Sequence, residues 1–455
     1  MKSYQSIAIL VLLLTLYGCD KYLDIQPKGR TLLTTVTDYE QWLNDPSLAV
    51  GFGAPSGYTM LFSDLVDVVN IPTPATSPAH LMYLWERQFS SDLNSAPLLW
   101  GEHYAKINHY NTVLLGIDRA TGGTAAAKKR LKAEALLGRA LEYFYLLNEY
   151  AQPYDGTTAA QDLAVPFVTS NDVTQVVPPR STSAEIFQHI VDDIQKAIPD
   201  LPIDNTKDRL KGSVAAAYSV LARAYFYTGD YQEARKYAEL ALSNTQAVML
   251  NLNAALPSSD LVGIRQDVIY GRFVLGNLTA SLDFMRSFAQ GDMRVRRLFL
   301  SLDNNTYDVR GATLFVPALV SPTLQYVNTG TSVQEMKLMI AEHAARNNEL
   351  RTALQQLDEL RSNRIAPASY TAFASTDQEA VLEQVLLERQ HELGFSGLRW
   401  FDMRRLDREG RMGTIYRYDA TGKVIATLEP HSNRYTLQIP LQVLSFNPGM
   451  SQNPL

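Results

Sequence analysis

The sequence predicts a mostly α-helical protein built from about four antiparallel helix pairs, with long loop insertions between the pairs. From residue 100 onward, apolar side chains recur at the spacing of one helix face. Glycine or asparagine interrupts the pattern at points where a left-handed residue would end a helix. Each pair buries only one of its faces, so several pairs must stack to form a core.

The chain begins with a segment that has the features of a lipoprotein signal peptide. Lys2 precedes an apolar run from Ile7 to Leu16, which at about ten residues is half the length of a membrane-spanning helix. The run leads into Cys19, which follows a large aliphatic, an arbitrary and a small residue, the pattern that lipoprotein signal peptidase recognises. Residues 1–18 are therefore predicted to be cleaved, and Cys19 is predicted to carry the lipid anchor.

The composition is that of a globular protein held together by packing. Cys19 is the only cysteine, so no disulfide can form within the chain. Hydrophobic residues make up 46% of the sequence and charged residues 19%, which is typical of a folded body. The formal net charge is −6 and no basic block occurs, which argues against nucleic acid as a partner.

The clearest helix pair lies between residues 215 and 241. Small side chains at Ala222 and Ala234 allow its two helices to approach closely. Gly229 supplies the left-handed residue that ends the first helix. The unit is therefore similar to a tetratricopeptide repeat.

Three further pairs are expected, each with two apolar-faced helices separated by glycine or asparagine. They cover residues 100–150 with a break at 122–123, residues 336–360 with a break at 347–348, and residues 378–406 with breaks at 394 and 397. Asparagine is the usual substitute for glycine in a left-handed cap. All four pairs together predict one helical scaffold rather than separate domains.

Two segments between the pairs are too long to be simple connections, namely residues 51–99 and 250–322. Loops longer than about 15 residues are usually functional or carry structure of their own. The binding site is therefore expected on these two insertions. The mature chain is predicted to form one composite body, with an N-terminal part at 19–250 and a C-terminal part at 251–455.

One stretch of the C-terminal part concentrates carboxylates and arginines. Glu388 and Glu392 are one helical turn apart, and Arg399 with Arg404 is expected to pair with them or with Asp402 in a partly buried network. Paired carboxylates also suggest a glycoside hydrolase. Carboxylates on one helix amid arginines favour ion pairing, so the structural interpretation is preferred.

The chain lacks the motifs of common enzyme classes. Its seven histidines include no His-Glu-x-x-His and no close pair at helical spacing, and no Gly-x-Ser-x-Gly is present. Asp303, its two neighbouring asparagines and Asp308 could hold calcium, but the glycine and terminal glutamate of an EF-hand loop are missing. We expect a solvated turn there, no cofactor and no enzymatic activity.

Sugar binding requires flat aromatic faces and planar polar side chains, and the insertions contain both. Trp85 is the leading candidate for a stacking face, because Trp42, Trp100 and Trp400 are expected in the core. A buried helix face is the alternative for Trp85, since apolar residues flank it. The other candidate ligand-binding residues are Tyr58, Asp67, Asn70 and Tyr83 in the first insertion, and Tyr270, Phe284 and Tyr307 in the second.

Motifs along almost the whole chain carry a family resemblance. They are Cys19 through Asp24, Trp100 and Tyr104 in the first long helix, the segment 132–150, the stretch from Gly397 to Arg405 with its core Arg399, Trp400 and Asp402, and the terminal Gln452-Asn453-Pro454. Together they resemble the SusD/RagB family of outer-membrane lipoproteins. The stretch from Gly397 to Arg405 is the most distinctive of them.

The resemblance implies a surface-exposed outer-membrane lipoprotein that binds an oligosaccharide and delivers it to a TonB-dependent transporter. It implies that the ligand lies where the two insertions meet, and that Arg399, Trp400 and Asp402 belong to the scaffold. The membrane contact would be through the lipid anchor, with the body facing outside. Two alternatives stay open: a peptide-binding protein like RagB, and a scaffold lipoprotein that uses its helical repeats for protein contacts.

Overall fold

The structure is a computed structural model that describes residues 33–51, 58–206, 208–255, 266–275, 278–316 and 326–455. Residues 1–18, the predicted signal peptide, and Cys19, the predicted lipid anchor, lie outside these residues, so both assignments stay predictions. Helices form the body, and the strands are short and confined to the connections between helices.

The helices fall into two groups by length. The helices of the body are α3 (Val36–Leu43), α6 (Trp100–Gly116), α7 (Ala125–Tyr150), α8 (Ser183–Ala197), α9 (Val214–Thr228), α10 (Tyr231–Asn244), α13 (Val333–Arg346), α14 (Leu350–Ser362), α15 (Gln378–Leu393) and α16 (Arg399–Arg408). The short helices within the connections are α5 (Pro78–Tyr83), α11 (Leu282–Arg286), α12 (Met293–Leu298) and α17 (Leu441–Phe446).

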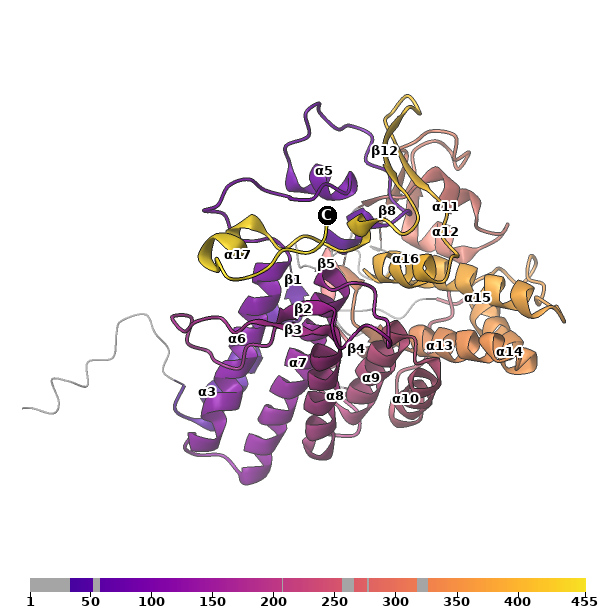
Figure 1. Cartoon of the computed structure of the whole chain (residues 1–455). Helices are drawn as coiled ribbons and strands as arrows, with labels where there is room; N and C mark the ends of the chain where they lie inside the picture. Colours follow the sequence, from indigo (N-terminus) through magenta and orange to yellow (C-terminus); the bar gives the residue numbers. More distant parts are fainter. Residues whose placement is uncertain (1–32, 52–57, 207, 256–265, 276–277, 317–325) are drawn as a thin grey trace, which may run out of the picture.

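The long helices stand side by side in a curved row (Figure 1). Along this row each of α6, α7, α8, α9 and α10 packs against the next, then α10 packs against α13, and α13 against α14 and α15. The connections with α5, α11, α17 and the strand β12 lie above the row in the same view. The mostly helical architecture of stacked pairs, predicted from the sequence, is confirmed.

Close packing in the row depends on small residues. Gly138 of α7 faces Tyr110 of α6, and a Cβ atom at Gly138 would lie 2.3 Å from Cζ of the Tyr110 ring. The pair α9–α10 is joined at Gly229, whose φ is +83°. Asn348 takes the equivalent left-handed conformation between α13 and α14, with φ at +59°. These turns occur where the sequence predicted them.

Two features of the row differ from the expected pairs. The segments on either side of Gly394 and Gly397 form α15 and α16, but α15 packs mainly against α13 and α14, whereas α16 packs against α9. The fourth expected pair is therefore present as two consecutive helices, which pack mainly on different neighbours and not on each other. The structure also contains α8 between α7 and α9, where the sequence analysis assigned no helix of a pair.

Gly229→Val is expected to lower the free energy of unfolding by about 1–2 kcal/mol, because a β-branched residue is strained in the left-handed region. No atom lies within 4 Å of the Cβ position, so the cost is backbone strain and not a clash. Chemical denaturation measures the change. Gly156→Val is the control, since Gly156 has similar open space without a positive φ. Equal losses in the two variants would contradict the assignment.

The strands of the described residues pair into small sheets of two or three strands. One sheet has the order β1 (Val50–Gly51), β5 (Phe273–Leu275), β9 (Tyr326–Asn328), and another has the order β6 (Leu278–Thr279), β8 (Thr313–Phe315), β7 (Phe299–Ser301). The two-stranded sheets are β10 (Thr331–Ser332) with β4 (Val268–Tyr270), β11 (Ile415–Tyr418) with β12 (Val424–Leu428), and β2 (Leu163–Pro166) with β3 (Arg180–Thr182). Adjacent strands are antiparallel except in the β1–β5 pair.

The two insertions pack against each other. The backbone N–H of Asp67 donates to the carbonyl of Thr279 at 3.0 Å, and the N–H of Ser281 donates to the carbonyl of Leu65 at 2.8 Å. Side chains from both insertions form a buried apolar cluster separate from the main core, together with Val327 of β9 and with Phe395 between α15 and α16. The insertions therefore carry a small core of their own, which fixes their position above the helices.

Candidate functional site

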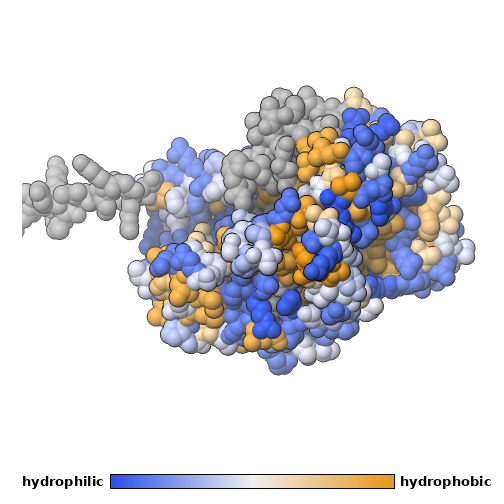
Figure 2. Space-filling model, turned by 90° about the horizontal axis from the view of Figure 1, so that it is seen from above, coloured by the Kyte–Doolittle hydropathy of each residue, from blue (hydrophilic) through white to orange (hydrophobic). Residues whose placement is uncertain are grey.

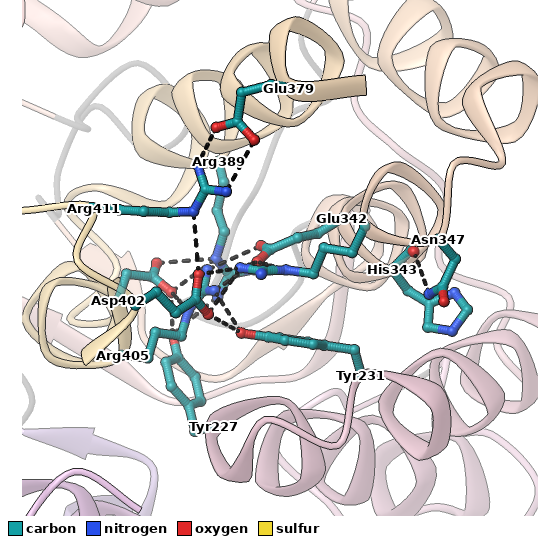
Figure 3. Close-up of polar contacts among 12 residues, drawn as sticks. Tyr227, Tyr231, Glu342, His343, Asn347, Glu379, Arg389, Asp402, Arg405 and Arg411 are labelled. Carbon is teal, nitrogen blue, oxygen red and sulfur yellow. Dashed lines mark hydrogen bonds and ion pairs between the residues drawn. The ribbon is translucent and has the colours of Figure 1, made fainter. Parts of the chain in front are cut away.

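A buried network of charged side chains lies where α9, α10, α13, α15 and α16 meet (Figure 3). Arg405 donates to both carboxylate oxygens of Glu342 at 2.6 and 2.9 Å, and its Nε donates to Asp402 at 2.8 Å. The Nε of Arg389 donates to both carboxylate oxygens of Asp402, at 3.1 and 3.0 Å. Burial would raise the pKa of both carboxyl groups, but the guanidinium groups outweigh it and lower both pKa values. The network is a structural clamp between helices.

Glu388 and Glu392 are also ion-paired, as the sequence indicated, but with other partners than expected. Glu388 accepts from Arg294 at 2.8 Å and from Arg361 at 2.9 Å. Glu392 accepts from Arg364 at 2.6 Å and from Arg294 at 3.2 Å. Both carboxylates are buried and shared between two arginines, so neither is arranged as a free acid or base of a glycoside hydrolase.

The expected partners of these two glutamates lie elsewhere, which corrects the assignment made from the sequence. Arg399 donates to both carboxylate oxygens of Asp64 at 2.8 and 2.6 Å, because the first turn of α16 faces the first insertion. Arg404 donates to the carbonyls of Asn148 and Ala151 at the end of α7. Carbonyls in the last turn of a helix have no partner within the helix, and a cation there is favourable.

Glu392→Gln is expected to lower stability at neutral pH and to have progressively less effect as the pH falls. Burial would raise the pKa of Glu392, but Arg364 and Arg294 lower it to about 2 from the usual 4.5. A carboxyl group with a lowered pKa stabilises the fold above its unfolded pKa, and this stabilisation is lost as the pH falls toward the folded pKa. Urea denaturation of both proteins between pH 7 and about pH 2.5 measures the difference. A difference that is independent of pH would contradict this role.

Trp85 and Tyr83 of the first insertion lie inside the protein. Trp85 is 3% exposed and its Nε1 donates to the carbonyl of Phe62 at 2.9 Å, and Tyr83 is fully buried. The guanidinium carbon of Arg417 lies 4.0 Å from the Trp85 ring centroid and 4.1 Å from the Tyr83 ring centroid. The expectation that Trp85 offers an open stacking face is therefore wrong, and the alternative of a buried position is what the structure shows. Tyr83, a candidate ligand-binding residue, is also covered, because Arg417 packs on both rings.

The polar candidates of the first insertion are divided between the interior and the surface. Asp67 is buried and pairs with Arg310 of the second insertion at 3.2 Å. Burial raises the pKa of Asp67, and Arg310 offsets this only in part. The guanidinium of Arg310 also lies 4.0 Å above the ring of Tyr418 in β11. Asn70 is exposed and Tyr58 is half-buried, so these two residues are accessible to a ligand.

Two of the three candidates in the second insertion are core residues. Tyr270 is buried, with Arg272 stacked 4.0 Å from its ring centroid. Phe284 belongs to the cluster shared by the insertions, where its ring centroid lies 5.7 Å from that of Phe395. Against the expectation that Tyr270 and Phe284 contact a ligand, neither side chain presents an open face, because Tyr270 is buried against Arg272 and Phe284 fills apolar space. Tyr307 is half-buried and remains accessible.

A polar pocket of about 210 Å³, which we call the Trp85 pocket, lies between the first insertion and the C-terminal segment. It is lined by Phe62, Trp85, Glu86, Arg87, Ser432, Asn433, Arg434, Thr436, Leu437, Gln438, Pro454 and Leu455. The Asn433 Nδ2 donates to the carbonyl of Leu455 at 2.7 Å, and the Gln438 Nε2 donates to the carbonyl of Pro454 at 2.9 Å. The C-terminus, marked C in Figure 1, is thus held below α5.

The chemistry of the Trp85 pocket suits a neutral polar ligand. Phe62 and Trp85 are almost completely buried at the edge of the pocket. Its exposed surface includes the apolar Pro454 and Leu455 and the polar side chains of Glu86, Arg87 and Arg434. Two planar guanidinium groups and one carboxylate can together donate to and accept from vicinal hydroxyl groups. Trp85 thus adjoins a candidate site, although it presents no open face.

The residues from Ser432 to Gln438 were not among the candidates from sequence. They are more than 300 positions from Trp85 and carry no aromatic residue other than the buried Tyr435. The only available signal was the run of polar side chains after Pro430. Polarity alone does not distinguish such a run from an ordinary surface loop.

The region around Asp303 forms a turn stabilised by its own hydrogen bonds. The Asp303 carboxylate accepts from the Ser301 hydroxyl at 2.6 Å and from the backbone N–H of Asp308 at 3.2 Å. Among the described residues, no group of three or more His, Cys, Asp or Glu side chains is placed to hold a metal ion. A search of the described helices finds none with both the length and the apolar character for crossing a membrane.

Comparison with known proteins identifies two matching family regions. Residues 21–226 match a SusD-like family described as "Starch-binding associating with outer membrane", and residues 334–455 match the SusD family. A SusD-like protein of Bacteroides ovatus is 27% identical over 161 residues, which are 32% of this chain and 27% of that protein. The SusD-like protein P2 of Formosa agariphila is 26% identical over 259 residues, or 55% of this chain and 48% of that protein. The chain thus spans about half, or less, of each of these relatives.

Solved structures share the fold along nearly the whole chain. A SusD superfamily protein from Bacteroides thetaiotaomicron has a TM-score of 0.73 at 20% identity, and the match covers 93% of this chain and 100% of that chain. Surface glycan-binding protein A from Bacteroides uniformis has a TM-score of 0.67 at 18% identity, with 92% and 98% covered. At sequence identities of 20% and 18%, this likeness establishes a shared fold and nothing further.

Proposed function

This chain belongs to the SusD/RagB family, and from that premise we propose that it binds an oligosaccharide at the outer membrane and delivers it to a TonB-dependent transporter. The description of one matching family names starch binding and association with the outer membrane. One relative of the same fold is a surface glycan-binding protein. Both support a glycan as the ligand class.

The observation that carries the proposal is the Trp85 pocket. Its planar polar side chains, Arg87 and Arg434, lie beside the exposed apolar side chains of Pro454 and Leu455. This combination suits a pyranose, which has an apolar C–H face and a rim of hydroxyl groups. At about 210 Å³ the pocket is smaller than the roughly 300–1,000 Å³ of a site for a drug-sized ligand. It therefore suits one unit of a longer sugar chain.

The proposed role is capture and not catalysis. The carboxylates that would be the candidates for a glycosidase, Glu388 and Glu392, are each held by two arginines. The modest size of the pocket and its exposed polar groups favour a dissociation constant between roughly micromolar and millimolar. Weak binding also suits a protein that must release its ligand to a transporter.

The sequence motif at Cys19 supports a location at the membrane through a lipid anchor. We propose that the mature chain begins at Cys19, carries acyl chains there and faces outside. Protease treatment of intact cells checks the orientation, and mass spectrometry of the N-terminal peptide checks the lipid. Full protection of the chain in intact cells would contradict surface display.

A glycan and peptide array, probed with the soluble chain that starts at residue 20, tests the ligand class. We expect a response to one class of neutral oligosaccharide. Binding of mixed peptides without any response to sugar would favour the peptide-capture alternative instead. No response to any sugar would contradict the proposal.

Arg434→Ala is expected to weaken binding of that oligosaccharide by at least roughly tenfold, which corresponds to about 1.4 kcal/mol, because one planar donor of the pocket is lost. The side chain of Arg434 is exposed, so the melting temperature should not change. Isothermal titration calorimetry measures the affinity. Arg119→Ala removes an exposed arginine outside the pocket and serves as the control. Equal binding by both variants would show that the ligand lies elsewhere.

A further inference from the structure

A second hollow, which we call the α6–α17 groove, shares no lining residue with the Trp85 pocket. Its volume is about 1270 Å³. Four segments line it, namely residues 93–97, the first half of α6, residues 167–178, and residues 442–450 in and after α17. The floor consists of side chains from α6, of which Trp100 and Ile107 are buried.

The rim of the groove exposes large apolar side chains on two sides. Val173 is 86% exposed and Val176 is 94% exposed on the 167–178 segment, and Phe446 is 82% exposed at the end of α17. Figure 2, which views the molecule from above, shows an apolar patch at its left side. In Figure 1, α17 lies at the left of the same upper side. Contiguous exposed apolar surface of this kind marks interaction sites on soluble proteins.

The groove is almost free of charge. No Lys, Arg or His lines it, and Asp172 is the only carboxylate among its lining residues. The Oδ1 of Asp172 accepts from the backbone N–H and the hydroxyl of Thr174 at 2.9 and 2.7 Å. This oxygen is therefore engaged in hydrogen bonds within its own loop. Amide side chains such as Asn94 and Gln175 supply uncharged polar groups at the rim. The Trp85 pocket, in contrast, contains two arginines and a glutamate.

We propose that the α6–α17 groove binds an uncharged, apolar segment of a partner protein. The volume exceeds the roughly 300–1,000 Å³ of a small-molecule site, which favours a polypeptide. A charged side chain in the groove would lose its hydration without gaining an ion pair, which selects an uncharged segment. This inference is independent of the proposed sugar site.

Photo-crosslinking in cells that produce the full chain tests the proposal. Val176 and Phe446 are replaced, one at a time, by p-benzoylphenylalanine, and Ile203, which is 65% exposed outside the groove, is replaced as a control. We expect the first two positions to link to the same partner polypeptide, at a stretch without charged residues, and Ile203 to give no such product. Adducts with lipid only, with a second copy of this chain, with a charged stretch, or no adducts at all would overturn the proposal.

A second measurement separates loss of docking from loss of folding. Phe446→Asp in the Val176→p-benzoylphenylalanine protein should reduce the crosslinked product roughly tenfold, because the new carboxylate has no cation in the groove. Ile203→Asp in the same background should leave the product unchanged. Melting temperature and oligosaccharide binding should be those of the parent protein in both variants. An undiminished product with Phe446→Asp would overturn the proposal, and failure of sugar binding alone would not.

Discussion

Arg405→Ala is expected to lower the free energy of unfolding by about 3–5 kcal/mol, because two buried carboxylates each lose one of the arginines that compensate their charge. Arg405 is 8% exposed, and it supplies three hydrogen bonds to Glu342 and Asp402. Glu342 would retain only Arg346, at 2.7 Å, and Asp402 would retain Arg389. Chemical denaturation followed by circular dichroism measures the loss.

Arg411→Ala is the matched control for Arg405→Ala. Arg411 appears at the edge of the same network in Figure 3, where it pairs with Glu379 on the protein surface. The Glu379 side chain is 55% exposed, and exposed ion pairs contribute at most about 1 kcal/mol. If Arg405→Ala and Arg411→Ala had similar effects, the buried network would not be the clamp between α13 and α16.

Trp85→Ala is expected to lower the free energy of unfolding by about 3–5 kcal/mol, the range for removing a large buried aromatic side chain. The ring is 3% exposed and its Nε1 donates to the carbonyl of Phe62. Its loss would also leave one face of the Arg417 guanidinium without a partner. Sugar binding should weaken in this variant through disorder of the Trp85 pocket. Thermal denaturation and calorimetric titration of the same sample measure both effects.

Loss of sugar binding in Trp85→Ala alone therefore does not identify a ligand contact. Trp85→Phe keeps most of the apolar volume and removes the Nε1 donor, so it should recover part of the stability and of the binding. Arg434→Ala should do the reverse, with full stability and weak binding. Full stability of Trp85→Ala together with loss of binding would contradict the burial of this side chain.

The helical scaffold was predictable because its signals are local. Gly229 and Asn348 end helices through their own backbone conformation, and the apolar spacing around them needs no knowledge of distant residues. The helix α8 shows that a further local signal was available. Thr182 and Glu185 form a capping box at its start, in which each side chain accepts from the other residue's backbone N–H.

The candidate site was predictable only in part because its partners are distant in sequence. Composition identified Trp85 by elimination of the other tryptophans, but could not show that Arg417, more than 300 residues away, packs on its ring. The same holds for Glu388, whose partner Arg294 belongs to the second insertion. Which arginine pairs with which carboxylate is decided by tertiary packing, and a single sequence does not carry that information.

Arg417 joins β11 to the first insertion in a way that leaves the solvent-facing residues of the insertion free to vary. Its guanidinium donates to the main-chain carbonyls of Leu61, Val66 and Tyr83. These acceptors are main-chain carbonyl oxygens, so any residue with the same backbone conformation provides them. Solvent-facing residues of the insertion can thus be exchanged without loosening this attachment.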